Sequence, residues 1–257
     1  MSVTTAQLAA GRNIAPDAAA TITQIDDSTV VKSGNSVRLA EAATMRYVAQ
    51  HTTVPVPRVH HSYQDSTSSK VHIVMDYVSG DTLEEVWPKL QEDEKSRILD
   101  QLQDILRQLR SLKGSFIGSI DGSFCEDVLF SECADPVGPF ESEKAFSAGM
   151  IAALQEKDQN IWVDLVSRMI ESTMHGHEIV LTHGDFLPRN ILIQGDKVVA
   201  ILDWEMAGWY PEYWEYCKIM YHPAWQAGWA NEKWEERITT PYYTELAVMM
   251  HAREIIW

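Results

Sequence analysis

The chain has 257 residues, of which 45% are hydrophobic, and a formal net charge of −16 from 21 basic and 37 acidic side chains. This length fits one domain or two lobes with a packed core. So acidic a chain argues against nucleic acid or anionic membranes as partners and favours cationic ligands. Three cysteines without a Cys-x-x-Cys pair, no secretory-signal pattern and no long apolar run predict a cytoplasmic protein without disulfides or membrane spans.

The first 77 residues combine short apolar runs with one helical period, separated by turn residues. Residues 1–20, rich in Ala and Thr, show no clear period and are expected to be a loose lead-in. The rest is expected to form a small sheet-plus-helix unit. Its expected elements are two short strands (21–25 and 29–32), a helix (36–51) and a further strand (71–77).

One cationic and one acidic side chain fall where this unit should be buried. Val37, Met45 and Val48 share one stripe of the expected helix with Glu41. A carboxylate on a buried face needs a cationic partner, because burying it alone is costly, and Lys32 on the preceding strand is the candidate. Kinases use such a pair, in which a strand Lys contacts nucleotide phosphates and a helix Glu holds it in place. The alternative is a surface lysine and a carboxylate on the helix rim.

A Gly-containing break over 78–81 follows the last of these strands and is expected to act as a hinge. The remaining residues, 82–257, should form a larger, mainly helical lobe. An apolar stripe over 92–112 predicts a core helix, and 143–172 reads as a second helix. Between them, 113–146 is irregular and rich in Gly, Ser, Pro and Asp, so it is either a substrate-facing loop or irregular packing.

The most informative stretch runs from Leu181 to Asn190 and is followed by Ala200 to Glu205. It sets an acid, an amide and a second acid on turns between apolar strands, in the kinase order His-x-Asp, four residues, Asn, then Asp at a strand end. Asp185 would receive or orient the proton of an attacking hydroxyl. Asn190 and Asp203 would hold Mg²⁺, which prefers hard oxygen ligands. His-x-Asp alone is weak, since Asp and Asn are common in turns; the joint spacing carries the prediction.

Together these motifs resemble the aminoglycoside phosphotransferase family, small-molecule kinases with a protein-kinase-like fold, and in particular its fungal branch. The resembling segments are Val30–Lys32, Glu41, Val54–Pro57, Ile73–Gly80, His183–Asn190, Leu202–Glu205 and Gly208–Glu215. The resemblance implies an α+β, two-lobed fold. Residues 1–77 would be the nucleotide-binding lobe with a sheet and a helix, 78–81 the hinge, and 82–257 the mainly helical catalytic and substrate lobe.

The resemblance also implies the cofactors and the site residues. ATP, with GTP as the alternative, would lie between the lobes together with Mg²⁺. The implied roles are catalytic base for Asp185, metal binding for Asn190 and Asp203, and nucleotide binding for Lys32, Glu41, Met75, Asp76 and Val78. In this arrangement the backbone of Asp76 and Val78 would hold the purine edge, with the Met75 side chain behind it. His183 would support the turn rather than act as a base.

One departure concerns the phosphates. Kinases cover them with a Gly-rich loop between two strands ahead of the lysine, whereas the only glycine ahead of Lys32 is Gly11. The front lobe is therefore expected to be a strand short. Asp26-Asp27-Ser28 would be a poor substitute for the missing loop, because two carboxylates there would repel phosphate.

The sequence thus predicts an ATP-dependent kinase of a small, polar or cationic molecule with a hydroxyl acceptor. The alternative is a kinase-like protein that binds nucleotide with weak or no activity, which the missing Gly-rich loop favours and the complete acid–amide–acid set opposes. A protein kinase is a third possibility, although no Ser or Thr occurs between Asp203 and Thr239 and no Ala-Pro-Glu anchor follows. The aromatic residues over 204–216 are either a substrate pocket or a core anchor.

Overall fold

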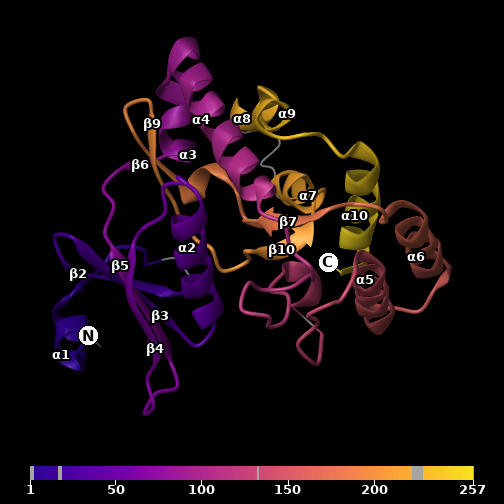
Figure 1. Cartoon of the computed structure of the whole chain (residues 1–257), viewed down its shortest axis with the longest axis horizontal. Helices are drawn as coiled ribbons and strands as arrows, with labels where there is room; N and C mark the ends of the chain where they lie inside the picture. Colours follow the sequence, from indigo (N-terminus) through magenta and orange to yellow (C-terminus); the bar gives the residue numbers. More distant parts are fainter. Residues whose placement is uncertain (1–2, 17–18, 132, 222–227, 257) are drawn as a thin grey trace.

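The computed structural model describes residues 3–16, 19–131, 133–221 and 228–256. It has a small lobe built on a sheet and a larger lobe built mainly of helices (Figure 1). The small lobe contains, in chain order, α1 (Thr5–Ala10), β1 (Arg12–Asn13), β2 (Thr21–Asp26), β3 (Thr29–Gly34), α2 (Leu39–His51), β4 (Val59–Gln64) and β5 (Val71–Asp76).

The sheet of the small lobe has the strand order β1-β2-β3-β5-β4, and every pairing in it is antiparallel. β5 lies between β3 and β4, which explains why its residues 71–75 are all buried. Helix α2 lies beside the sheet (Figure 1) and buries a face that includes Met45 and Val48. Apolar residues at helical spacing and continuous apolar strand residues therefore form one shared core.

The expectation that the front lobe lacks a strand is wrong. Residues Arg12 and Asn13 pair with β2, and the Ile14 N–H donates to the carbonyl of Ile22. A two-residue strand is too short to show a period of two, so the sequence pattern hid it. Gly11 enables the approach, because a Cβ there would lie 2.5 Å from Thr23 Cγ2. Within the lead-in, Thr4 and Gln7 form a capping box for the short helix α1.

The larger lobe begins after the segment that follows β5. Its elements are β6 (Asp81–Thr82), α3 (Leu83–Val86), η1 (Trp87–Lys89), α4 (Glu92–Ser111), η2 (Val128–Phe130), α5 (Glu143–Lys157), α6 (Ile161–Thr173), β7 (Ile179–Thr182), η3 (Pro188–Asn190), β8 (Ile191–Gln194), β9 (Lys197–Ile201), β10 (Gly208–Pro211), α7 (Trp214–Tyr221), α8 (Gly228–Asn231), α9 (Trp234–Ile238) and α10 (Tyr243–Ile256). Within the ranges described, no helix combines the length and apolar character needed to cross a membrane.

Helix α4 confirms the apolar stripe, whereas the single helix expected over 143–172 is two helices, α5 and α6. The break falls at Asp158–Asn160, and the Asn160 side chain accepts hydrogen bonds from the N–H groups of Trp162 and Val163. An N-cap of this kind begins a new helix. Helices α5, α6 and α10 pack together at the end of the molecule away from the small lobe (Figure 1).

The aromatic residues after β9 are core rather than pocket lining. Trp204, Tyr213 and Trp214 are fully buried, and Trp209, Tyr210 and Tyr216 nearly so. Tyr210 stacks on Trp214 with ring centroids 5.3 Å apart. This packing anchors the segment that follows Asp203, because its large rings are buried and fix the path of the chain.

Candidate active site

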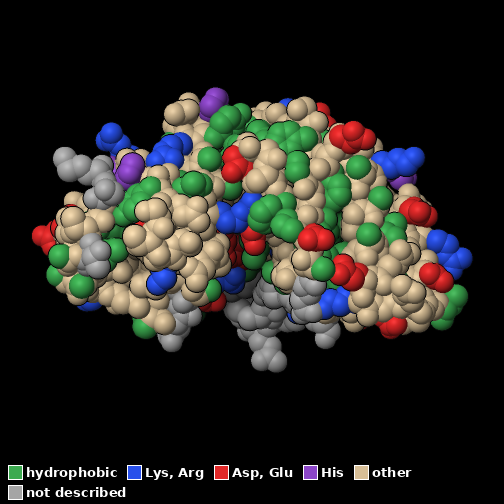
Figure 2. Space-filling view, turned by 90° about the horizontal axis from the view of Figure 1, so that it is seen from below, with side chains coloured by type: hydrophobic (Ala, Val, Ile, Leu, Met, Phe, Trp, Pro, Cys, Tyr) green, Lys and Arg blue, Asp and Glu red, His purple; other side chains and the backbone are tan. Residues whose placement is uncertain are grey.

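A cleft of about 540 Å³ lies between the lobes. One wall of the cleft includes Ile22, Val30 and Met75 from the small lobe. The other wall includes Leu192 and Leu202 from the larger lobe. Apolar side chains above and below a narrow space suit a flat, aromatic ligand. On the face shown in Figure 2, acidic and basic side chains gather where the two lobes meet. The cleft therefore joins an apolar slot to a charged end.

The front wall of the cleft comes from the connection between β1 and β2, where Ile14, Ala15, Ala19 and Ala20 line the space. The turn Asp26-Asp27-Ser28, judged from the sequence to be a poor substitute for the Gly-rich loop, does not line the cleft. It joins β2 to β3, and the carbonyl of Ser28 accepts from the N–H of Tyr77 at 2.7 Å. An Ala-rich connection thus occupies the place where kinases carry their Gly-rich loop, and it brings no carboxylate among the residues described.

Lys32 on β3 lies buried at the charged end. Its Nζ donates to Glu41 Oε1 at 3.0 Å, to Asp203 Oδ1 at 2.7 Å and to Glu205 Oε2 at 3.2 Å. Burial lowers the pKa of Lys32, but the three carboxylates outweigh it and raise the pKa overall. Burial raises the pKa of Glu41, and the Lys32 ammonium opposes that rise. The Lys32 ammonium therefore pairs with three carboxylates, one from the small lobe and two from the larger lobe.

The turn of Asp185 is built on the short helix η3. Asn190 Nδ2 donates to the Asp185 carbonyl at 2.9 Å and to its Oδ2 at 2.7 Å. Because the nitrogen of this amide faces Asp185, its oxygen is the atom left to bind a cation. Arg189 Nη2 donates to both carboxylate oxygens of Asp185, at 2.7 and 2.8 Å. Asp185, Arg189 and Asn190 are thus held in one hydrogen-bonded unit.

His183 and Glu215 accept hydrogen bonds from backbone N–H groups of this turn. His183 is fully buried, accepts at Nδ1 from the N–H of Asp185 and contacts the Leu202 carbonyl through Nε2. Burial lowers its pKa, which favours the neutral ring that this pairing requires. Glu215 on α7 accepts from the N–H groups of His183 and Gly184, at 2.6 and 3.1 Å. The structure thus gives His183 a positioning contact on each nitrogen.

Asp203 follows β9 with a left-handed backbone, φ +63°. A non-glycine residue there costs about 1 kcal/mol or more. The ring of Trp204 is buried and its Nε1 donates to the Ile201 carbonyl at 2.9 Å, which holds the turn. The strained backbone aims the Asp203 carboxylate into the cleft, toward Lys32. Strain held by packing at such a place is typical of functional sites.

The structure brings the predicted residues together. Seven line the cleft: Lys32, Glu41, Met75, Asp76, Val78, Asn190 and Asp203. Asp185 adjoins it through Asn190. Sequence reasoning gave no role to Glu205, Arg189 and Glu215, although all three lie inside the resembling segments. Their place in these segments was the available signal, but it did not show which atoms they contact.

The irregular segment after α4 contacts the small lobe. Arg38, at the start of α2, donates to Glu126 Oε2 at 2.8 Å and to Ser123 Oγ at 2.7 Å. Its guanidinium also lies 3.8 Å from the centre of the Phe124 ring. Farther along, Phe130 packs with Phe140 and Phe146. One part of the segment is therefore core packing, and another part reaches the helix that carries Glu41.

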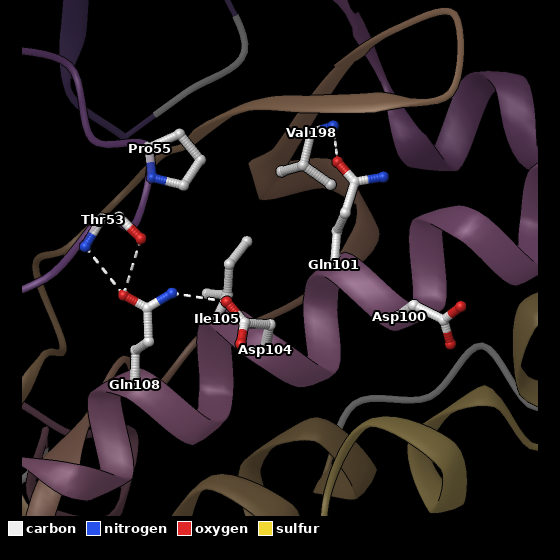
Figure 3. A pocket seen from close by; sticks show the side chains of 8 residues that line it. All are labelled: Thr53, Pro55, Asp100, Gln101, Asp104, Ile105, Gln108 and Val198. Carbon is white, nitrogen blue, oxygen red and sulfur yellow. Dashed lines mark hydrogen bonds between the residues drawn. The ribbon is translucent and has the colours of Figure 1, made fainter.

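A second hollow, of about 420 Å³, lies between the segment around Thr53, helix α4 and β9 (Figure 3). Gln108 Oε1 accepts from the N–H and the hydroxyl of Thr53, at 2.8 and 3.0 Å. Gln101 Oε1 accepts from the Val198 N–H at 3.0 Å. Both side-chain amides form hydrogen bonds that connect α4 to the segment around Thr53 and to β9. We therefore interpret the hollow as a structural crevice.

Comparison with known proteins decides the family. A family model described as the phosphotransferase enzyme family matches residues 25–248. The chain belongs to this family. No curated protein matches the chain significantly. The family match spans most of the chain and includes the seven predicted residues that line the cleft, together with Asp185.

Solved structures of phosphotransferases share the fold. A thermostable mutant of aminoglycoside phosphotransferase APH(4)-Ia, in ternary complex with AMP-PNP and hygromycin B, is 18% identical with a TM-score of 0.61, covering 92% of this chain and 80% of that one. A gentamicin complex of APH(2")-IIa is 17% identical (TM-score 0.57; 92% and 77%). ADP-bound APH(2'')-Ib is 18% identical (TM-score 0.59; 92% and 77%). At these identities the likeness shows the fold: the α+β, two-lobed, kinase-like architecture.

The residues present fit Mg²⁺, the metal ion expected from the motif spacing. Asn190 and Asp203 offer an amide oxygen and a carboxylate to the same cleft, and both are hard oxygen donors. Among the residues described, no three His, Cys, Asp or Glu side chains form a group that could hold a metal. Mg²⁺ bound through two side chains, nucleotide phosphates and water needs no such group.

Proposed function

We propose that the protein transfers the γ-phosphate of ATP, or of GTP, to a hydroxyl of a small polar or cationic molecule in the cytoplasm. The arrangement of Lys32, Glu41, Asn190 and Asp203 around one cleft, with Asp185 beside it, supports this proposal most. Within it, residues 1–77 bind nucleotide, 78–81 act as the hinge, and 82–257 carry catalysis and substrate binding. We also propose that the chain belongs to the fungal branch of the family.

Each residue has a defined task in this proposal. The backbone of Asp76 and Val78 binds the purine edge, and Met75 closes the slot behind it. Lys32, held by Glu41, donates to phosphate oxygens. Asp185 accepts the hydroxyl proton as a general base, while His183 and Glu215 keep its turn in place. Bound at Asn190 and Asp203, Mg²⁺ would neutralise charge on the phosphates.

The charges near the cleft support a cationic acceptor. Asp203 and Glu205 have side chains 37% and 34% exposed, and Glu126 is 40% exposed. Burial raises the pKa of Glu126, and Glu205 contributes to that rise, which places the two carboxylates in one electrostatic neighbourhood. An amine-bearing substrate would relieve this repulsion. The buried aromatic segment after Asp203 further supports a small acceptor, because it has no activation loop.

The test is nucleotide consumption with Mg²⁺ against a panel of alcohols, amino sugars and proteins, with ATP and GTP in parallel. We expect turnover with a small hydroxyl compound and none with Asp185→Asn. Nucleotide binding without turnover on any acceptor would favour the kinase-like binding protein instead. Phosphorylation of proteins, with none of the small molecules, would overturn the proposed acceptor class.

A further inference from the structure

Arg189 has a contact that the tasks above leave unused. Its Nη2 donates to both oxygens of the Asp185 carboxylate, at 2.7 and 2.8 Å. The Arg189 side chain is 49% exposed, whereas that of Asp185 is 14% exposed. An ion pair with one partner so exposed adds little to stability. The contact therefore invites an explanation in the chemistry of the site.

At the charged end of the cleft, three carboxylates contact the ammonium of one lysine. Lys32 is already shared by Glu41, Asp203 and Glu205, and nucleotide phosphates would add further negative charge. Phosphoryl transfer spreads that charge over the oxygens of the moving group and the leaving oxygen. A guanidinium suits this task, because its planar fork can donate to two phosphoryl oxygens at once. Arg189 follows Asp185 by four residues and reaches its carboxylate.

We infer that Arg189 is a further catalytic residue, which holds Asp185 before the reaction and donates to the transferred phosphoryl group during it. The inference rests on the proposed function. In the step, the acceptor oxygen bonds to the γ-phosphorus, and the bond from that phosphorus to the β–γ bridging oxygen breaks. Its electron pair leaves with the nucleoside diphosphate, and the acceptor proton passes to Asp185. Arg189 contacts Asp185 through Nη2, so the other N–H groups of its guanidinium can donate to the phosphoryl oxygens while that contact holds.

The experiment compares Arg189→Ala and Arg189→Lys with Arg107→Ala. Arg107 on α4 is a matched control, since it also pairs with a nearby aspartate, Asp104, and is 74% exposed. Binding of Mg²⁺ and ADP is measured by calorimetry with and without fluoroaluminate, a mimic of the transferring phosphoryl group. We expect Arg189→Ala to bind ADP alone nearly as wild type does but to lose most of the extra affinity that fluoroaluminate gives.

With an active acceptor, kcat of Arg189→Ala should fall by roughly 10² to 10³, and added guanidinium chloride should restore part of it. Arg189→Lys, which keeps the charge, should lie between. Equal gains from fluoroaluminate in wild type and Arg189→Ala would overturn the role of Arg189 while leaving the proposed function intact. A wild-type protein that binds no nucleotide would overturn both.

Discussion

Two hollows of comparable size, about 540 and 420 Å³, differ in what their polar groups do. In the crevice beside α4, Gln101 and Gln108 are hydrogen-bonded across elements, and Asp100 and Asp104 pair with Arg237 and Arg107. In the cleft, one lysine serves three carboxylates, and Asp203 holds a strained backbone. The difference teaches that unbalanced charge and strain, more than volume, distinguish a site from a packing gap.

Replacing Asp185, the proposed base, should give the largest effect. Asp185→Asn should lower kcat by about 10² to 10⁴, because an amide cannot take the hydroxyl proton. Nucleotide affinity should stay near wild type, since Asn190 and Lys32 remain in place. Turnover and calorimetric binding of ATP are measured side by side. Turnover close to wild type would remove Asp185 from the mechanism and weaken the contrast between the two hollows.

Removing the proposed metal ligands should give the next largest effect. Asp203→Ala should weaken Mg²⁺-dependent ATP binding by about a hundredfold, because it takes a full negative charge from the metal. Asn190→Ala should cost less, since an amide brings only a dipole. ATP is titrated with and without Mg²⁺ in each variant. The same Mg²⁺ dependence in wild type and Asp203→Ala would contradict the assignment.

The buried ion pair should have a smaller effect on activity. Lys32→Met should lower kcat/KM for ATP by roughly tenfold to a hundredfold, as expected for loss of charge-assisted hydrogen bonds to phosphate. Glu41→Gln should do so more mildly, because Lys32 keeps its contacts to Asp203 and Glu205. Steady-state kinetics with varied ATP measures both. Unchanged kinetics in Lys32→Met would leave the lysine with a structural role alone.

Stability should depend on pH through Glu215. Burial raises its pKa from 4.5 to about 7, against the opposing N–H groups of His183 and Gly184. The folded protein thus holds this proton more tightly than the unfolded chain, so the free energy of unfolding should fall as pH rises between these values. The expected loss is on the order of 3 kcal/mol, at about 1.4 kcal/mol for each unit of pKa difference. Urea unfolding measured across this pH range should show that the free energy of unfolding of Glu215→Gln changes less with pH than that of wild type. The same dependence on pH in both proteins would contradict the role of Glu215.

The crevice should respond least. Gln108→Ala should lower the free energy of unfolding by only about 1 kcal/mol, because the exposed Thr53 N–H can form a hydrogen bond with water instead. Nucleotide binding and turnover should stay unchanged. Chemical unfolding and the acceptor assay measure the two. A large loss of activity would show that the crevice couples to the cleft, and the comparison would have to be redrawn.

The sequence predicted the elements with a strong period and the residues with a fixed spacing. The stripe of α4 and the series Asp185, Asn190, Asp203 are local patterns, so they could be read directly. The two-residue strand β1 has no period, and the break before α6 needed the cap of Asn160. Contacts between distant residues could not be predicted, as with Glu205, which lies 173 positions from Lys32. Their geometry depends on the packing of both lobes.

The hydrogen bonds from His183 and Gly184 to Glu215 have a consequence for synthesis of the chain. Glu215 follows Gly184 by 31 positions, so the ribosome releases Asp185 and Asn190 well before the residue that secures their turn. A nascent chain ending soon after Glu205 would carry every residue that lines the cleft, yet two N–H groups of the turn would lack their buried acceptor. We therefore expect the turn to gain its final shape only once α7 has been made and has docked.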